Sequence, residues 1–330
     1  MRIPGLLAAP VLAATLLTGC SSRDVLLDRA FVSNEWDGTV SVIDTREDRV
    51  LATYRVGGRA RGMRVSSDGR RLYVAVSYPS RHEATGEDAV VALDAASGRV
   101  LHRFPVGSAP ERFAVTPDET RLFTSNENVG TLSVTDVRAG RVIAAIPVGD
   151  EPEGVGLSPD GRTVYVTSEA GDKVSVVDAT SYRLLGAIGT GGRPRAVDFS
   201  PDASRAYVSA EVGKSVSILD ARTLAVLRVV PIAGEGVKPM GVAAAPNGGL
   251  VYVSTGRGNS VVVIDPAREG PVRTIATGQR PWGLALTKDG GKLYTANGLS
   301  NDVSVIDTRL GRIVGTIPVG ERPWDVVIPR

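Results

Sequence analysis

The sequence predicts an all-β protein, a β-propeller of seven four-stranded antiparallel blades. The short run VSVID, or a close relative of it, recurs seven times at intervals of 42 to 50 residues, and the copies end at Asp44, Asp94, Asp136, Asp178, Asp220, Asp265 and Asp307. Each repeat consists of short alternating runs and turns rich in Gly and Asp, which is typical of propeller blades. The chain shows no sustained period of 3.6 residues, so no substantial helix is expected.

Residues 151–191 illustrate the four strands of one repeat. EGVGL (153–157) is predicted to form a short inner strand, and the following SPDG (158–161) a turn, because its residues favour turns. Residues 163–168 alternate apolar and polar like a half-buried strand. Residues 174–178 and 184–188 are expected to form the third and fourth strands. Strands equivalent to 163–168 carry an aromatic residue at Phe31, Tyr73, Phe123, Tyr165, Tyr207, Tyr252 and Tyr294.

The chain enters the repeats in the middle of a blade, at Phe31, and ends with a lone inner strand at residues 324–329. We expect this C-terminal strand to complete the blade that begins at Phe31 and so to close the ring. Closure removes the exposed sheet edges that an open array would have to cap.

Composition excludes several classes of site. The 38 basic and 36 acidic residues give a net charge of +2, which argues against a surface devoted to nucleic acid. The single cysteine, Cys20, permits no intrachain disulfide, and two histidines, His82 and His102, cannot supply a three-histidine zinc site. His82 lies in an insertion at residues 78–88 that also contains carboxylates. We expect a solvated loop there and no metal site.

The N-terminus has the pattern of an export signal. An apolar stretch follows Arg2 and ends in Leu17-Thr18-Gly19-Cys20, and it is too short for a membrane span. This run resembles the lipobox of bacterial lipoproteins, in which the cysteine is lipidated, and Ser21 implies outer-membrane sorting. The expected organisation is a signal peptide at 1–19, a lipidated linker at 20–29 and a propeller at 30–330.

The repeats resemble the YVTN family of β-propellers over almost the whole mature chain. Runs such as PERFAVTPD, EPEGVGLSPDG and RPWDVVI are similar to the subgroup associated with PQQ-dependent alcohol catabolism. This resemblance implies an exported protein that accompanies PQQ-dependent dehydrogenase systems and has no defined activity of its own. Lactonase-type seven-bladed propellers share the fold, so function has to be argued from a site.

Candidate site residues lie on one face of the ring, in the loops before the inner strands and after the aromatic strands. Each of these loops contains a proline or an equivalent residue just before the inner strand. The residues that follow this position in the seven blades are Trp324, Arg61, Glu111, Glu153, Arg195, Met240 and Trp282. The residues that precede it are Arg322, Arg59, Ala109, Glu151, Arg193, Lys238 and Arg280. Nine residues before the marker aspartates stand Glu35, Glu127, Glu169 and Glu211, with Gly256 and Gly298 in the last two repeats.

This face is therefore expected to be asymmetric. The glutamates and arginines of one sector are as well explained by mutual pairing as by binding. The other sector combines Met240, Trp282 and Trp324 with Lys238, Arg280 and Arg322, and tryptophan beside arginine suits planar anionic ligands and protein hot spots.

We expect a lipid-anchored, monomeric propeller that works by binding a ligand or an envelope partner such as a PQQ-dependent dehydrogenase. No cofactor is required, although PQQ is a candidate ligand. Two alternatives stay open: a lactonase-like hydrolase with a central Glu/Arg cluster, and a periplasmic nucleic-acid binder whose bases stack on the tryptophans. The absence of a ring histidine disfavours the enzyme.

Overall fold

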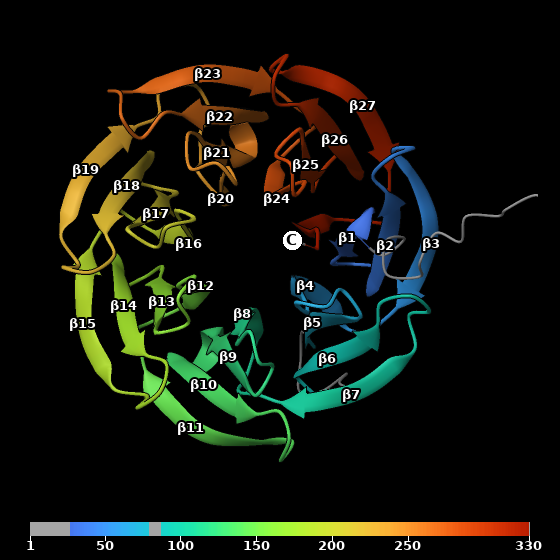
Figure 1. Cartoon of the computed structure of the whole chain (residues 1–330), viewed down its shortest axis with the longest axis vertical. Helices are drawn as coiled ribbons and strands as arrows, with labels where there is room; N and C mark the ends of the chain where they lie inside the picture. The colour runs from blue at the N-terminus through green and yellow to red at the C-terminus, as the bar shows by residue number, and fades with distance from the viewer. Residues whose placement is uncertain (1–26, 79–86, 330) are drawn as a thin grey trace, which may run out of the picture.

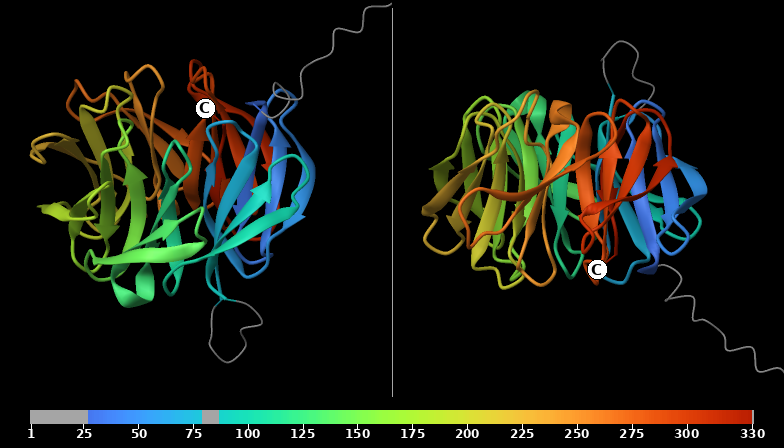
Figure 2. Two further views of the ribbon diagram at one scale, coloured as in Figure 1. Left: turned by 60° about the horizontal axis from the view of Figure 1, so that its bottom comes forward. Right: turned by 90° about the horizontal axis from the view of Figure 1, so that it is seen from above.

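A computed structural model describes residues 27–78 and 87–329. These residues form a ring of seven four-stranded antiparallel sheets around a central channel, as Figures 1 and 2 show from above and from the side. The predicted seven-bladed β-propeller is confirmed. The expected signal peptide, Cys20 and His82 lie outside the described residues. Within the described ranges, no helix has the length and apolar character needed to cross a membrane.

The strands of each blade run from the channel outward. Blade 1 comprises β28 (Pro323–Val327), β1 (Arg29–Asn34), β2 (Thr39–Asp44) and β3 (Arg49–Arg55). Blade 2 comprises β4 (Arg59–Val65), β5 (Arg71–Ser77), β6 (Ala89–Asp94) and β7 (Val100–Pro105). Blade 3 comprises β8 (Pro110–Val115), β9 (Arg121–Asn126), β10 (Thr131–Asp136) and β11 (Arg141–Pro147). Blade 4 comprises β12 (Pro152–Leu157), β13 (Thr163–Ser168), β14 (Lys173–Asp178) and β15 (Leu184–Gly189).

The remaining three blades follow the same order. Blade 5 comprises β16 (Pro194–Phe199), β17 (Arg205–Ala210), β18 (Ser215–Asp220) and β19 (Val226–Pro231). Blade 6 comprises β20 (Val242–Ala244), β21 (Val251–Ser254), β22 (Ser260–Ile264) and β23 (Pro271–Ala276). Blade 7 comprises β24 (Pro281–Leu286), β25 (Lys292–Asn297), β26 (Asp302–Asp307) and β27 (Arg312–Pro318). Two single-turn 3₁₀ helices, η1 (Glu127–Val129) and η2 (Gly256–Gly258), follow β9 and β21.

The C-terminal strand closes the ring as expected. In blade 1, β28 pairs antiparallel with β1, with Val326 opposite Val32 and Val327 opposite Phe31. Ala30 and Val32 of β1 pack in one apolar cluster with Tyr294 and Val303 of blade 7. The first and last blades are therefore joined both by a backbone ladder and by a shared core.

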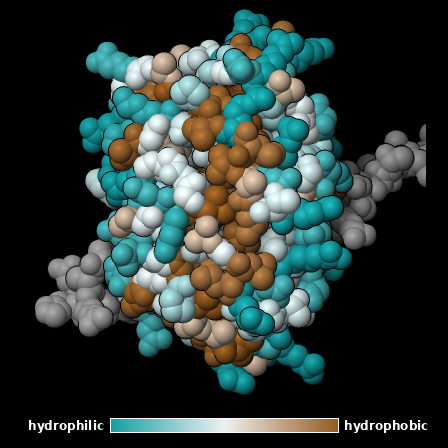
Figure 3. All heavy atoms as spheres, turned by 90° about the vertical axis from the view of Figure 1, so that its left-hand side faces the viewer, coloured by the Kyte–Doolittle hydropathy of each residue, from teal (hydrophilic) through white to brown (hydrophobic). Residues whose placement is uncertain are grey.

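The core lies between the blades, because the inner and middle strands are buried on both faces while the outer strands are half exposed. On the left of Figure 1, apolar side chains also gather in a band on the outside of the ring, over β15 and β19 (Figure 3). Leu184, Leu185, Leu227 and Val229 of these two outer strands are about half exposed. The buried charged residues, in contrast, lie around the channel, on the inner strands or in the loops beside them.

The aspartates that end the seven VSVID-type runs are structural. The Asp44 carboxylate accepts the backbone N–H groups of Arg46 and Glu47 in its own turn, at 2.8 and 3.0 Å. The equivalent aspartates of the other blades accept hydrogen bonds from their own turns in the same way. These local bonds fix the hairpins between the third and fourth strands.

Candidate functional site

The ring positions identified in the sequence meet at one end of the central channel, where the seven inner strands begin. We call this end the N-terminal rim and the opposite end, formed by the SPDG-type turns, the C-terminal rim. All inner strands except β20 show a register irregularity near their first residues, as between Pro152 and Val155 of β12. The irregularity recurs in most blades, so equivalent side chains point to the same level of the channel.

Arg195 is the hub of a buried ionic network at this rim. Its guanidinium contacts the carboxylates of Glu153, Glu169 and Glu211, and the Nε–Oε2 distance to Glu211 is 2.7 Å. The three glutamate side chains are only 6% exposed, and that of Arg195 is 12% exposed. Burial lowers the pKa of Arg195, but the carboxylates outweigh burial and raise it overall. The hub therefore stays charged and is neutralised by its own neighbours.

A second hub, Arg61, lies on blade 2. It reaches Glu35 at 3.2 Å, contacts Glu111 and lies 3.7 Å from Glu127, while Arg59 also pairs with Glu35. Burial, followed by the charge of Arg59, lowers the pKa of Arg61, and the nearby carboxylates oppose this shift. Mutual pairing thus accounts for the Glu/Arg sector.

Lys238 belongs to this network and not to the aromatic sector in which the sequence placed it. Its Nζ lies 2.7 Å from Oε1 of Glu211. Burial raises the pKa of Glu211, but Lys238 and Arg195 outweigh it and the pKa is lowered overall. The charge of this lysine is therefore neutralised by an internal ion pair.

The aromatic sector is built from blades 7 and 1. The rings of Trp282 and Trp324 lie 5.9 Å apart with an interplanar angle of 32°. Arg280 covers Trp282 at 4.5 Å from its centroid, and Arg112 covers Trp324 at the same distance. Trp324 is only 4% exposed, because Arg112 and the second indole cover it. It therefore does not present an open ring face to a ligand. Trp282 is the more accessible of the two.

Met240 does not line open space either. It is 4% exposed, and a Cβ on Gly256 would lie 3.1 Å from its Cγ. Gly256 also has a φ of +53°, in the left-handed region that favours glycine. The glycine therefore makes room for the methionine and for the η2 turn.

Trp36 is the site residue that the sequence reasoning missed. It is 61% exposed, and the guanidinium of Arg322 lies 4.2 Å from its ring centroid. All three tryptophans of the chain thus lie in this sector. Trp36 could have been identified from the sequence, because it directly follows Glu35, one of the ring positions.

Positive charge in this sector is uncompensated. Within residues 27–78 and 87–329, no carboxylate lies within ion-pair distance of Arg257, Arg280 or Arg322, although the other arginines of the rim are paired. The buried Nε of Arg322 has no hydrogen-bond partner there. Burial, then the charge of Arg322, lowers the pKa of Arg280; the more distant carboxylate of Glu35 opposes this shift and Arg257 adds to it. The sector is an array of cations beside indole faces.

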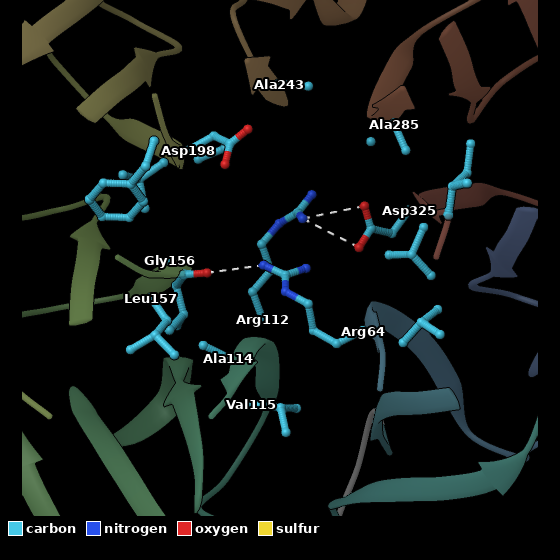
Figure 4. Close-up of a pocket in the computed structure, with 18 of the residues that line it drawn as sticks. Arg64, Arg112, Ala114, Val115, Gly156, Leu157, Asp198, Ala243, Ala285 and Asp325 are labelled. Carbon is cyan, nitrogen blue, oxygen red and sulfur yellow. Dashed lines mark hydrogen bonds and ion pairs between the residues drawn. The ribbon is translucent and has the colours of Figure 1, made fainter. Parts of the chain in front are cut away.

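The C-terminal half of the channel holds a cavity of about 480 Å³ (Figure 4). Its charged lining residues, Arg64, Arg112, Glu119, Asp198 and Asp325, lie outside the ring positions chosen from the sequence. Arg112 Nη1 lies 3.3 Å from both carboxylate oxygens of Asp325, across the channel. This pair separates the cavity from the aromatic sector.

Asp88 lies at the end of the insertion predicted at residues 78–88, most of which is outside the described residues. Its carboxylate accepts the backbone N–H groups of Tyr78 and Ala109 at 2.9 and 2.7 Å. Across the described ranges, histidine, cysteine and carboxylate side chains form no group suited to a metal ion. Asp88 therefore acts as a structural tie between two loops.

Two family models match the chain. One, described as "Lactonase, 7-bladed beta-propeller", matches residues 154–322, and the other, a YNCE-like beta-propeller, matches residues 81–205. No curated protein matches the sequence.

Similar solved structures share the fold. Hydrazine synthase of Kuenenia stuttgartiensis is 22% identical, with a TM-score of 0.74 over 85% of this chain and 92% of that chain. A protein of unknown function from Desulfotomaculum acetoxidans is 18% identical, with a TM-score of 0.77 over 91% and 98%. A Bacteroides fragilis protein provisionally assigned as a 6-phosphogluconolactonase is also 18% identical, with a TM-score of 0.75 over 93% and 99%. At these identities the likeness concerns architecture.

Proposed function

The chain belongs to the family of seven-bladed lactonase β-propellers, and from this premise we propose that it binds a planar polyanion at the aromatic sector of the N-terminal rim. Membership of the family describes the scaffold, while function depends on the site that a member carries. In this member, the uncompensated cations and the indole faces occupy one sector of the rim.

The uncompensated charge of Arg280 and Arg322 carries this proposal. Arg280 and Arg322 are half-buried and carry no ion pair among the described residues, whereas Arg61 and Arg195 are paired with carboxylates. A partly desolvated charge is more costly without a partner than with one. An anionic ligand would supply the missing partner, since a guanidinium can hold a carboxylate through two parallel hydrogen bonds. The half-buried Trp282 and the exposed Trp36 would offer ring surface for a flat ligand to stack on.

PQQ is our candidate ligand. It is planar and carries three carboxylates, and the sector offers three arginines without carboxylate partners in the described chain, Arg257, Arg280 and Arg322. Binding of PQQ would agree with an accessory role in PQQ-linked alcohol oxidation at the cell envelope. An acidic patch on a dehydrogenase would use the same chemistry, so it is the second ligand to test.

The test measures PQQ affinity by titration calorimetry. Trp282→Ala and Arg322→Gln should each weaken binding by about 1–3 kcal/mol, because they remove a stacking face or a charged hydrogen-bond donor. Arg162→Gln, an exposed arginine away from this rim, is the matched control and should bind like the unmodified protein.

Several outcomes would contradict the proposal. If the protein binds neither PQQ nor a dehydrogenase, or if the two variants bind as tightly as the control, the sector is structural. Tight binding of single-stranded oligonucleotides in place of PQQ would favour the nucleic-acid alternative.

Lactone hydrolysis is a second candidate, favoured by the family model over residues 154–322. Its central carboxylates Glu153, Glu169 and Glu211 are all paired with Arg195, so they are poorly placed to accept a proton from water. Turnover of a lactone panel that is lost in Glu169→Gln, with the fold intact, would establish the hydrolase and displace the binding proposal.

A further inference from the structure

The C-terminal cavity differs from the aromatic sector in position and in chemistry. It is formed by the C-terminal halves of the inner strands and the SPDG-type turns, and its volume of about 480 Å³ is within the usual range of ligand pockets. The Arg112–Asp325 pair lines it on the side of the aromatic sector, where Arg112 covers Trp324 at 4.5 Å. A ligand in this cavity would therefore be out of contact with one bound at the N-terminal rim.

At one level of the cavity, most of the wall is formed by small or medium-sized apolar residues. In each blade, the residue that pairs with the aromatic residue of the second strand lines the cavity, as the pairs Ala114–Phe123 and Ala285–Tyr294 illustrate. Five blades place small or medium apolar residues there, namely Ala114, Gly156, Ala243, Ala285 and Val327. The cavity exists because these side chains are short.

The two remaining blades place opposite charges at this level. Arg64 pairs with Tyr73 and Asp198 with Tyr207, so both occupy the position that is apolar elsewhere. Figure 4 shows the Asp198 carboxylate entering the channel from blade 5, while the guanidinium groups of Arg64 and Arg112 reach its centre from blades 2 and 3. The other five blades pack with an uncharged residue at this position.

The carboxylate of Asp198 is available to a ligand. It accepts the backbone N–H of Ala244 at 2.9 Å, and no lysine or arginine of residues 27–78 and 87–329 lies within ion-pair distance of it. A carboxylate has capacity for further donors beyond one N–H group. Arg64 is oriented by bonds to the carbonyls of Met63 and Val155, at 2.8 and 3.2 Å.

We propose that this cavity binds a small zwitterion of amino-acid size, with its ammonium group on Asp198 and its carboxylate facing Arg64 and Arg112. Of the five charged lining residues, Glu119 pairs with Arg71 of its own rim, and the charges of Arg64, Arg112, Asp198 and Asp325 sum to zero, which matches a ligand that carries one charge of each sign. The apolar wall would hold the rest of the ligand. An isolated anion would face Asp198, and an isolated cation would face Arg64.

The test uses titration calorimetry of the protein with the common α-amino acids. Each amino acid that binds is compared with its amine and acid analogues, for example leucine with isopentylamine and 4-methylpentanoate. We expect at least one amino acid to bind with a Kd below about 1 mM, and each analogue to bind about tenfold or more weakly.

Two variants locate the site. Asp198→Asn keeps the acceptor for the Ala244 N–H and should weaken binding about tenfold or more, because only the charge is lost. Ala285→Leu should block the cavity by volume, and it tests the location even if Asp198→Asn folds poorly. Arg280→Gln, at the other rim, is the control and should leave amino-acid binding unchanged.

The proposal is wrong if no amino acid binds below about 1 mM, or if an amine or an acid alone binds as well as the zwitterion. It is equally wrong if Ala285→Leu binds normally. Because PQQ binding is measured at the opposite rim, failure here leaves the function proposed above untouched.

Discussion

Replacement of Arg195 by Met tests whether the Glu/Arg sector is a structural network. The change keeps most of the side-chain volume and removes the guanidinium group that contacts Glu153, Glu169 and Glu211 together. All three carboxylates are about 94% buried, so they would be left close together with less compensation. Breaking a buried ion pair from one side typically costs about 3–5 kcal/mol.

This cost translates into a measurable change of melting temperature. About 300 ordered residues at ~2.1 cal/mol/K each give an unfolding entropy of ~0.6 kcal/mol/K, so the loss corresponds to about 5–8 °C. Calorimetry or circular dichroism near neutral pH measures it. Arg162→Met, at an 83% exposed side chain, is the control and should shift the melting temperature by less than about 1 °C.

Acidification provides an independent check of the cause. The pKa of Glu211 is lowered below its ordinary value of 4.5, so its stabilising effect is present above about pH 4.5 and is lost as the pH falls through the lowered pKa. The melting temperature of the unmodified protein should therefore fall on acidification, and that of Arg195→Met should fall less. The difference between the two melting temperatures should narrow below about pH 4.5. A melting temperature of Arg195→Met equal to that of Arg162→Met at neutral pH would refute the structural interpretation.

Three further predictions follow from other parts of the chain. Deletion of residues 323–330 should prevent cooperative folding, because it removes β28 and exposes β1, and thermal unfolding measures this against removal of Arg330 alone. Burial raises the pKa of Tyr165 to about 12, so its contribution to stability is complete below pH 10 and is lost toward pH 12. Tyr165→Phe should remove one tyrosinate absorbance step near pH 12, and an unchanged titration would contradict this. Cys20→Ala should release the protein from the membrane fraction, since acyl chains contribute about 0.8 kcal/mol per buried methylene. A variant that stays with membranes after a salt wash would argue against the lipid anchor.

Local patterns in the sequence were sufficient for the architecture. Strand alternation, turn residues and a fixed repeat each depend on neighbours close along the chain, and each blade has to bury its faces against the next. The closing strand at residues 323–327 could be predicted because a lone inner strand has one vacant partner, β1. The hydrogen bonds of Asp44 were equally predictable, since the acceptor and its donors lie within three residues.

Which side chains meet across the channel was decided only by the tertiary structure. Repeat alignment placed Lys238 and Arg280 at equivalent positions, yet Lys238 pairs with Glu211 while Arg280 covers Trp282. It likewise could not show that Arg112 reaches Asp325, a residue 213 positions away, or that Asp198 enters a cavity. The sequence alone determined the blades and the level of each side chain, because these follow from short-range periodicity. Pairing at the axis depends on the angle at which the seven blades converge and on the length of every side chain there. These side chains meet only in the closed ring, so their pairing cannot be inferred from the repeats one at a time.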